Sequence, residues 1–134
     1  MFVATALILA IQSISGFSPT DAQIKARYSD QYRTCMKQGD AAQGITSGMM
    51  DCMGLEIDRQ DDKLNQAYRA TLKRLSKRRQ GKLRESERAW VKRSDRDCVA
   101  AGNASGGGSA AGPIFNDCTI TKLITRRMWL EVYR

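Results

Sequence analysis

The sequence of 134 residues contains no histidine. Histidine is the commonest general base in enzymes and the base of the usual Ser and Cys triads, so its absence excludes those mechanisms. Paired carboxylates occur at Asp61-Asp62 and at Asp95 with Asp97. Neighbouring acids on a helix point in different directions, however, and exposed aspartates are normally solvated. We therefore predict that the protein is not an enzyme.

Motifs for metals and cofactors are also missing. The four cysteines include no Cys-x-x-Cys pair and have no histidine beside them, so they do not form a typical zinc or redox site. Asp58, Asp61 and Asp62 lack the glycine-containing spacing of a calcium loop. We predict no metal and no cofactor, and we interpret the cysteines as two disulfides formed in an oxidising compartment.

Four cysteines can pair in three ways, and the sequence alone does not choose between them. We favour Cys35 with Cys52 and Cys98 with Cys118, because each of these pairs encloses a glycine-containing connector between predicted helices. Each closure is expected to stabilise the folded chain by roughly 3 kcal/mol, since it restricts the unfolded chain.

Charged residues are absent from residues 1–15, in which an apolar run precedes the small-residue tripeptide Ser13-Ile14-Ser15. This pattern is typical of a secretory signal peptide, and it is too short for a membrane-spanning helix. We predict a signal peptide over residues 1–15 and an exported domain over residues 16–134, periplasmic or secreted, with no stable membrane insertion after cleavage. Because basic residues are missing from the segment, a buried N-terminal strand is the alternative.

Glycine and proline are absent from residues 83–98, whose apolar positions recur at intervals that place them on one side of a helix. Residues 51–77 have the same periodicity. The connector over residues 76–81 is short and polar and ends in glycine, so we expect the two helices to form a long antiparallel hairpin. We expect the two helices to pack directly against each other along the Trp90 side. The predicted core residues of the hairpin are Leu64, Tyr68 and Trp90.

Two further helices are predicted, one on each side of the hairpin. The first begins at Ser18 as its N-cap and carries an apolar stripe as far as Cys35. A loop is expected over residues 38–48, and the last helix over residues 115–132 follows a glycine-rich loop. The predicted fold class is all-α: a small disulfide-stapled helical bundle built on the hairpin, with an N-terminal and a C-terminal helix.

Basic residues outnumber acids, giving a net charge of +8. Residues 69–96 hold twelve Lys or Arg and three acids, whereas residues 40–62 hold six acids and Arg59 alone. We therefore expect an acidic end and a basic hairpin tip. A tip of this kind can bind an anionic envelope component or a protein surface, although a solvated charged face is the simpler interpretation. Nucleic acid is not an expected partner, because no aromatic residues alternate with the basic ones.

An ordered series of short motifs runs through residues 35–130. In chain order it comprises Met49-x-x-Cys52, Asp61-x-x-Leu64-Asn65-x-x-Tyr68, Arg88-Ala89-Trp90, Asp95, Cys98, Gly107-Gly108-Ser109, Cys118, Arg126 and Leu130. The series resembles the LprI-type lysozyme-inhibitor family of small exported bacterial domains, in which Gln is more usual than Glu at the position of Glu87. The resemblance implies an all-helical, disulfide-stapled domain that inhibits lysozyme.

Two surfaces are candidates for contact with lysozyme, whose cleft presents two carboxylates. One is the loop with Gly107, Gly108 and Ser109, and the other is the basic tip with Arg78 and Arg79. The alternative function is a periplasmic structural or interaction module that binds an anionic component or another envelope protein through this tip. Arg88 is a further candidate for partner binding, but we favour a structural role in which Arg88 pairs with a carboxylate such as Asp61.

Overall fold

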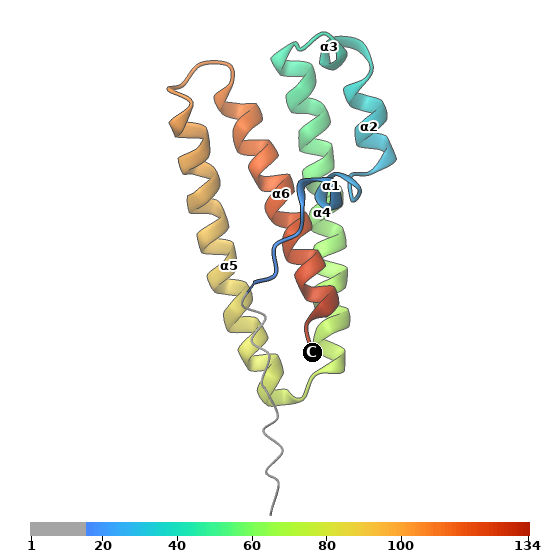
Figure 1. Ribbon diagram of the computed structural model, residues 1–134, viewed down its shortest axis with the longest axis vertical. Coiled ribbons are helices and arrows are strands. Elements are labelled where there is room, and N and C mark those ends of the chain that lie inside the picture. The colour runs from blue at the N-terminus through green and yellow to red at the C-terminus, as the bar shows by residue number, and fades with distance from the viewer. Residues whose placement is uncertain (1–15) are drawn as a thin grey trace, which may run out of the picture.

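The computed structural model describes residues 16–134, and the signal peptide predicted for residues 1–15 lies outside this range. The described residues form six helices and no strand, so the all-α prediction is confirmed. Three long helices dominate the molecule, and three short ones lie beside α4 and α6 (Figure 1). The helices are α1 (Asp21–Lys25), α2 (Asp30–Met36), α3 (Gly39–Ala42), α4 (Thr46–Arg74), α5 (Lys77–Ala104) and α6 (Ala111–Val132).

Helix α6 lies between α4 and α5 (Figure 1) and packs against both. The hairpin is present, because only Leu75 and Ser76 separate α4 from α5. However, α4 and α5 scarcely touch each other, so the direct packing along the Trp90 side that we expected is wrong. The reason is that α6 is the most apolar of the three long helices. Placing it in the middle buries both of its sides and removes more apolar surface from water.

The buried side chains form two clusters. The first joins α2, α3, α4 and α6 and includes Tyr32, Met53 and Ile124. The second lies nearer the hairpin connection, and its buried members are Leu64, Leu83, Leu123 and Leu130. Of the three predicted core residues, Leu64 is only 3% exposed, and Tyr68 and Trp90 are half-buried and pack against the second cluster.

Both disulfides have the predicted pairing. Cys35–Cys52 links α2 to α4, and Cys98–Cys118 links α5 to α6. The first bond fixes the short N-terminal helices to the bundle. The second fixes the helices on either side of the glycine-rich loop, so the loop has a rigid base.

The N-terminal segment differs from the single helix predicted to start at Ser18. Thr20 is the N-cap of α1 and forms a capping box with Gln23. The chain then leaves the helix, and Ser29 caps α2. Ser29 donates from its backbone N–H and from its hydroxyl to the buried carboxylate of Glu56 on α4. This long-range contact explains why two short helices replace one, since Ser29 adopts extended backbone in order to reach Glu56.

The remaining predicted boundaries are only partly correct: α5 and α6 begin earlier than predicted, α4 ends at Arg74 instead of Lys77, and the loop expected over residues 38–48 contains α3. Helix α4 begins at Thr46 instead of Asp51, and Gly48 lies in its first turn. A Cβ atom at Gly48 would be 2.6 Å from the Cβ atom of Asp40 and 2.7 Å from the backbone N of Ala41, so glycine allows α3 to approach α4 closely. At the hairpin connection, Ser76 caps α5 directly, which places Gly81 inside the helix instead of in the turn.

Candidate functional site

A buried arginine joins α6 to α5. Arg126 is 7% exposed, and its Nε–H donates to Oε2 of Glu87 at 2.8 Å while Nη2 donates to Oγ of Ser86 at 2.9 Å. Its guanidinium lies 3.9 Å from the ring centre of Trp129 and 5.7 Å from that of Trp90. Burial lowers the pKa of Arg126, and the charge of Glu87 opposes that shift. Arg126 therefore stacks closely on Trp129 and lies within cation–π range of one side of the Trp90 ring.

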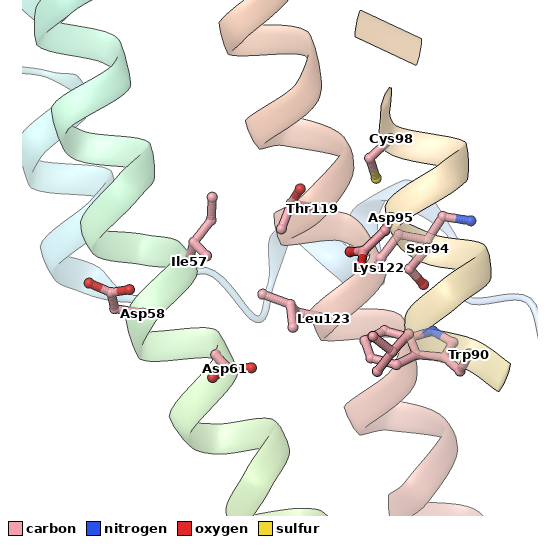
Figure 2. Close-up of a pocket in the computed structure, with 11 residues that line it drawn as sticks. Ile57, Asp58, Asp61, Trp90, Ser94, Asp95, Cys98, Thr119, Lys122 and Leu123 are labelled. Carbon is pink, nitrogen blue, oxygen red and sulfur yellow. The ribbon is translucent and has the colours of Figure 1, made fainter. Parts of the chain in front are cut away.

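A hollow of about 260 Å³ opens between α4 and α5, because α6 keeps these two helices apart (Figure 2). Its apolar surface comes from all three long helices: Ile57 from α4, Trp90 from α5 and Leu123 from α6. Ser94, which is only 8% exposed, also lines the hollow. We call this feature the α4–α5 hollow.

The charged residues of the α4–α5 hollow are mainly acidic. Asp58 and Asp61 come from α4, and Asp95 comes from α5; Asp61 and Asp95 stand on opposite walls (Figure 2). The one basic lining residue is Lys122, whose Nζ donates to Oδ2 of Asp97 at 3.0 Å. The hydrogen bond from Lys122 lowers the pKa of Asp97. The charge of Lys122 is thus directed to Asp97, which does not line the hollow, and the hollow carries net negative charge.

The glycine-rich loop joins α5 to α6 at one end of the molecule (Figure 1). Gly106, Gly107 and Gly108 have φ angles of +76°, +86° and +78°, and the space beside each is open. Three successive residues in this region of φ require glycine, since other residues are strained there. Ser109 is exposed as well. The backbone of Gly107 and Gly108 is therefore accessible to a partner.

The basic tip lies at the opposite end of the molecule, at the connection between α4 and α5 (Figure 1). Arg74, Arg79 and Arg134, which come from three separate segments, line a hollow of about 340 Å³ there. The guanidinium of Arg79 lies 5.7 Å from the ring centre of Tyr133. Arg78 is exposed in the first turn of α5, where the positive end of the helix dipole adds to the basic charge.

The structure separates the predicted contact residues into distinct regions. The glycine-rich loop and the basic tip are at opposite ends of the bundle, so they cannot enter the same narrow cleft together (Figure 1). Arg88 lies on the exposed surface of α5 between them. Asp61 accepts a hydrogen bond from Asn65. No ion pair between Arg88 and Asp61 occurs in the described part of the chain, so the pairing that we favoured for Arg88 is wrong.

The Arg126 contact and the α4–α5 hollow were not found by sequence reasoning. Arg126 was noted only as part of the family motif, because an arginine on the apolar side of a helix gives no local sign of its acceptor. The lining of the hollow comes from three helices, so helical periodicity alone did not reveal it.

Across residues 16–134, no three His, Cys, Asp or Glu side chains are grouped so that they could hold a metal ion. None of the helices in this range has the length and hydrophobicity that crossing a membrane requires.

Fold and surfaces define a small helical domain with two disulfides, an exposed glycine-rich loop and a basic tip. The chain belongs to the family described as lysozyme inhibitor LprI, whose model matches residues 35–130. The resemblance inferred from the short motifs is thereby confirmed, and the matched region includes both disulfides. Neither the comparison with curated proteins nor the comparison with solved structures finds a match.

Proposed function

We propose that this protein is exported and inhibits lysozyme as a binding protein without enzymatic activity. The observation that carries the proposal is the family match, which extends from Cys35 in α2 to Leu130 in α6. Two disulfides support folding in an oxidising compartment such as the periplasm or the cell exterior. Residues 1–15 are the proposed signal peptide, and residues 16–134 the mature domain.

The proposed inhibitory element is the glycine-rich loop with Gly107, Gly108 and Ser109. It lies at the end of the molecule, its glycines are surrounded by open space, and the Cys98–Cys118 bond fixes its base. A glycosidase cleft contains two carboxylates, and backbone N–H groups form strong hydrogen bonds with carboxylates. Because the Cys98–Cys118 bond also restrains the helices on both sides of the loop, less entropy is lost when the loop binds than for an unrestrained segment.

The first experiment measures the lysis of bacterial cell walls by several types of lysozyme. The oxidised protein of residues 16–134 is added in micromolar excess over each lysozyme. We expect inhibition that increases with protein concentration. Unchanged lysis by every lysozyme tested at that excess would disprove lysozyme inhibition.

A pair of glycine variants tests the loop. Gly107→Asp places a carboxylate where we expect contact with the cleft carboxylates, so inhibition should weaken by at least about tenfold through charge repulsion. Gly44→Asp is the matched control, because Gly44 also has a positive φ (+73°) with open space beside it, and it lies outside the loop. Equal inhibition by the two variants would show that the loop is not the inhibitory element.

The second candidate function is a periplasmic module that binds an anionic envelope component or protein through the basic tip. The hollow lined by Arg74, Arg79 and Arg134 favours it, because arginines from three separate segments surround that hollow. Pull-down from envelope extract and with lysozyme, each at low and high salt, separates the two candidates.

Charge reversal at the tip tests this second candidate. Binding to the anionic component should fall strongly in Arg78→Glu/Arg79→Glu. It should persist in Lys63→Glu/Lys92→Glu, which makes the same change in charge at exposed sites away from the tip. Binding that is insensitive to salt would count against a role for the tip.

A further inference from the structure

We infer that the α4–α5 hollow binds a single arginine or lysine side chain from a basic partner protein. The inference deepens the proposed function and rests on it where that partner is lysozyme, since many animal lysozymes are basic. It concerns a surface separate from the glycine-rich loop, which we propose as the inhibitory element.

The size of the hollow favours one long side chain. Its volume of about 260 Å³ is below the roughly 300 to 1,000 Å³ of pockets that enclose a drug-sized ligand. The hollow is also preformed in the bundle, because the apolar helix α6 separates α4 from α5 and the Cys98–Cys118 bond holds α5 to α6. A site of this kind needs no rearrangement to receive a protruding side chain.

The charge of the hollow selects a cation. Asp61 and Asp95 face each other across it, Asp58 lies further out on the α4 wall, and no ion pair within residues 16–134 involves any of the three (Figure 2). Lys122 is paired with Asp97 and does not neutralise them. The protein as a whole carries a charge of +8 and repels a basic partner at long range. Within the hollow, where we propose that the partner side chain binds, the charge is negative and attracts a cation.

The surfaces between these carboxylates suit the aliphatic part of Lys or Arg. Trp90 and Leu123 line the hollow together with Ile57. Arg126 lies 5.7 Å from the centre of the Trp90 ring on one side. The half-buried ring also lines the hollow, where a guanidinium or an ammonium group is attracted to an aromatic face. The hydroxyl of Ser94, which forms no hydrogen bond with another side chain in the described part of the chain, adds a polar group to the wall.

The hollow also brings together residues of motifs that are distant in the sequence. Asp61 belongs to the motif in α4, while Trp90, Asp95 and Cys98 belong to the motifs in α5. All four line the same hollow. Neither the loop at one end nor the tip at the other uses these residues, and the hollow gives them a common location.

The first experiment measures the dissociation constant of a basic lysozyme by titration calorimetry. Asp61→Asn/Asp95→Asn should weaken binding by about tenfold or more, because two charged contacts are lost. Asp40→Asn/Asp51→Asn is the control: it changes the net charge equally at exposed positions outside the hollow and should change binding less than about twofold. If both double variants bind as the unchanged protein does, the inference is overturned while lysozyme inhibition stands.

A second experiment does not use lysozyme, so it tests whether the hollow binds an arginine side chain even if no lysozyme binds the protein. N-acetyl-arginine amide, whose only charge is the guanidinium, is titrated into the ¹⁵N-labelled protein, with N-acetyl-citrulline amide as the uncharged analogue. The Trp90 indole N–H signal, assigned with Trp90→Phe, should shift and saturate at millimolar concentration with the arginine compound alone. No saturable shift, or equal shifts with both compounds, overturns the inference.

Discussion

Arg126 of α6 donates from Nε–H to Oε2 of Glu87 on α5 at a distance of 2.8 Å, and both side chains are largely withdrawn from solvent. The pair connects the two helices that the Cys98–Cys118 bond also joins, eleven residues from that bond along α5 and eight residues from it along α6. Because the Arg126 guanidinium also lies 5.7 Å from the ring centre of Trp90, the pair is next to one wall of the α4–α5 hollow. Glu87 thus has a structural role.

Replacing Glu87 should show how much the Arg126–Glu87 pair contributes to the free energy of unfolding. Glu87→Ala leaves the Arg126 guanidinium buried without its counter-charge, so we expect the free energy of unfolding to fall by about 2 to 4 kcal/mol. Glu87→Gln keeps a hydrogen-bond acceptor and should cost about 1 kcal/mol. Urea unfolding with the disulfides intact measures both changes. The exposed Glu85→Ala should stay within about 0.5 kcal/mol, and an equal loss at Glu87 and Glu85 would contradict the role of the pair.

The carboxylate of Glu56 predicts how stability depends on pH. Burial raises its pKa, but hydrogen bonds from Gln60 and Ser29 outweigh burial, so the pKa lies below the ordinary value of glutamate. A lowered folded-state pKa contributes stability above the unfolded pKa, and this contribution is lost as the pH falls through the folded value. We expect the free energy of unfolding to decrease below about pH 5. Glu56→Gln should reduce this decrease, and an unchanged pH profile would contradict the prediction.

The two disulfides should have equal effects on stability and different effects on inhibition. Removing either one with paired serines, Cys35→Ser/Cys52→Ser or Cys98→Ser/Cys118→Ser, should lower the free energy of unfolding by roughly 3 kcal/mol. Inhibition measured well below the melting temperature should weaken only in the second variant, because that bond fixes the base of the glycine-rich loop. Equal inhibition by both variants would argue against a fixed loop.

Two glycines in α4 should respond in opposite ways to alanine. At Gly48 the new Cβ atom would overlap Asp40 and the backbone of Ala41, so Gly48→Ala should destabilise the protein by about 1 to 3 kcal/mol. At Gly54 the space is open, and the higher helix propensity of alanine should stabilise the protein by up to about 1 kcal/mol. Melting temperatures measure both. Destabilisation by Gly54→Ala would indicate a contact at that glycine which the structure does not show.

The all-α class and the general order of the long helices could be predicted from the sequence, and the favoured disulfide pairing, one of three that the sequence allows, proved correct. These features are local: helical periodicity lies within one segment, and both disulfides close a short connector between neighbouring helices. The sequence did not locate the break before α2 or the start of α4. Both depend on contacts with distant residues, namely Ser29 with Glu56 and Gly48 with Asp40.

The sequence by itself determined which side of each helix is apolar, and it favoured one of the three possible cysteine pairings, which the structure then confirmed. Only the tertiary structure decided that α6 lies between α4 and α5, and this arrangement creates the α4–α5 hollow and the Arg126–Glu87 pair. Periodicity identifies the side of a helix that must be buried, but it does not identify the helix that covers it. That choice depends on the total apolar surface removed from water by the whole bundle, which is a property of all the helices together.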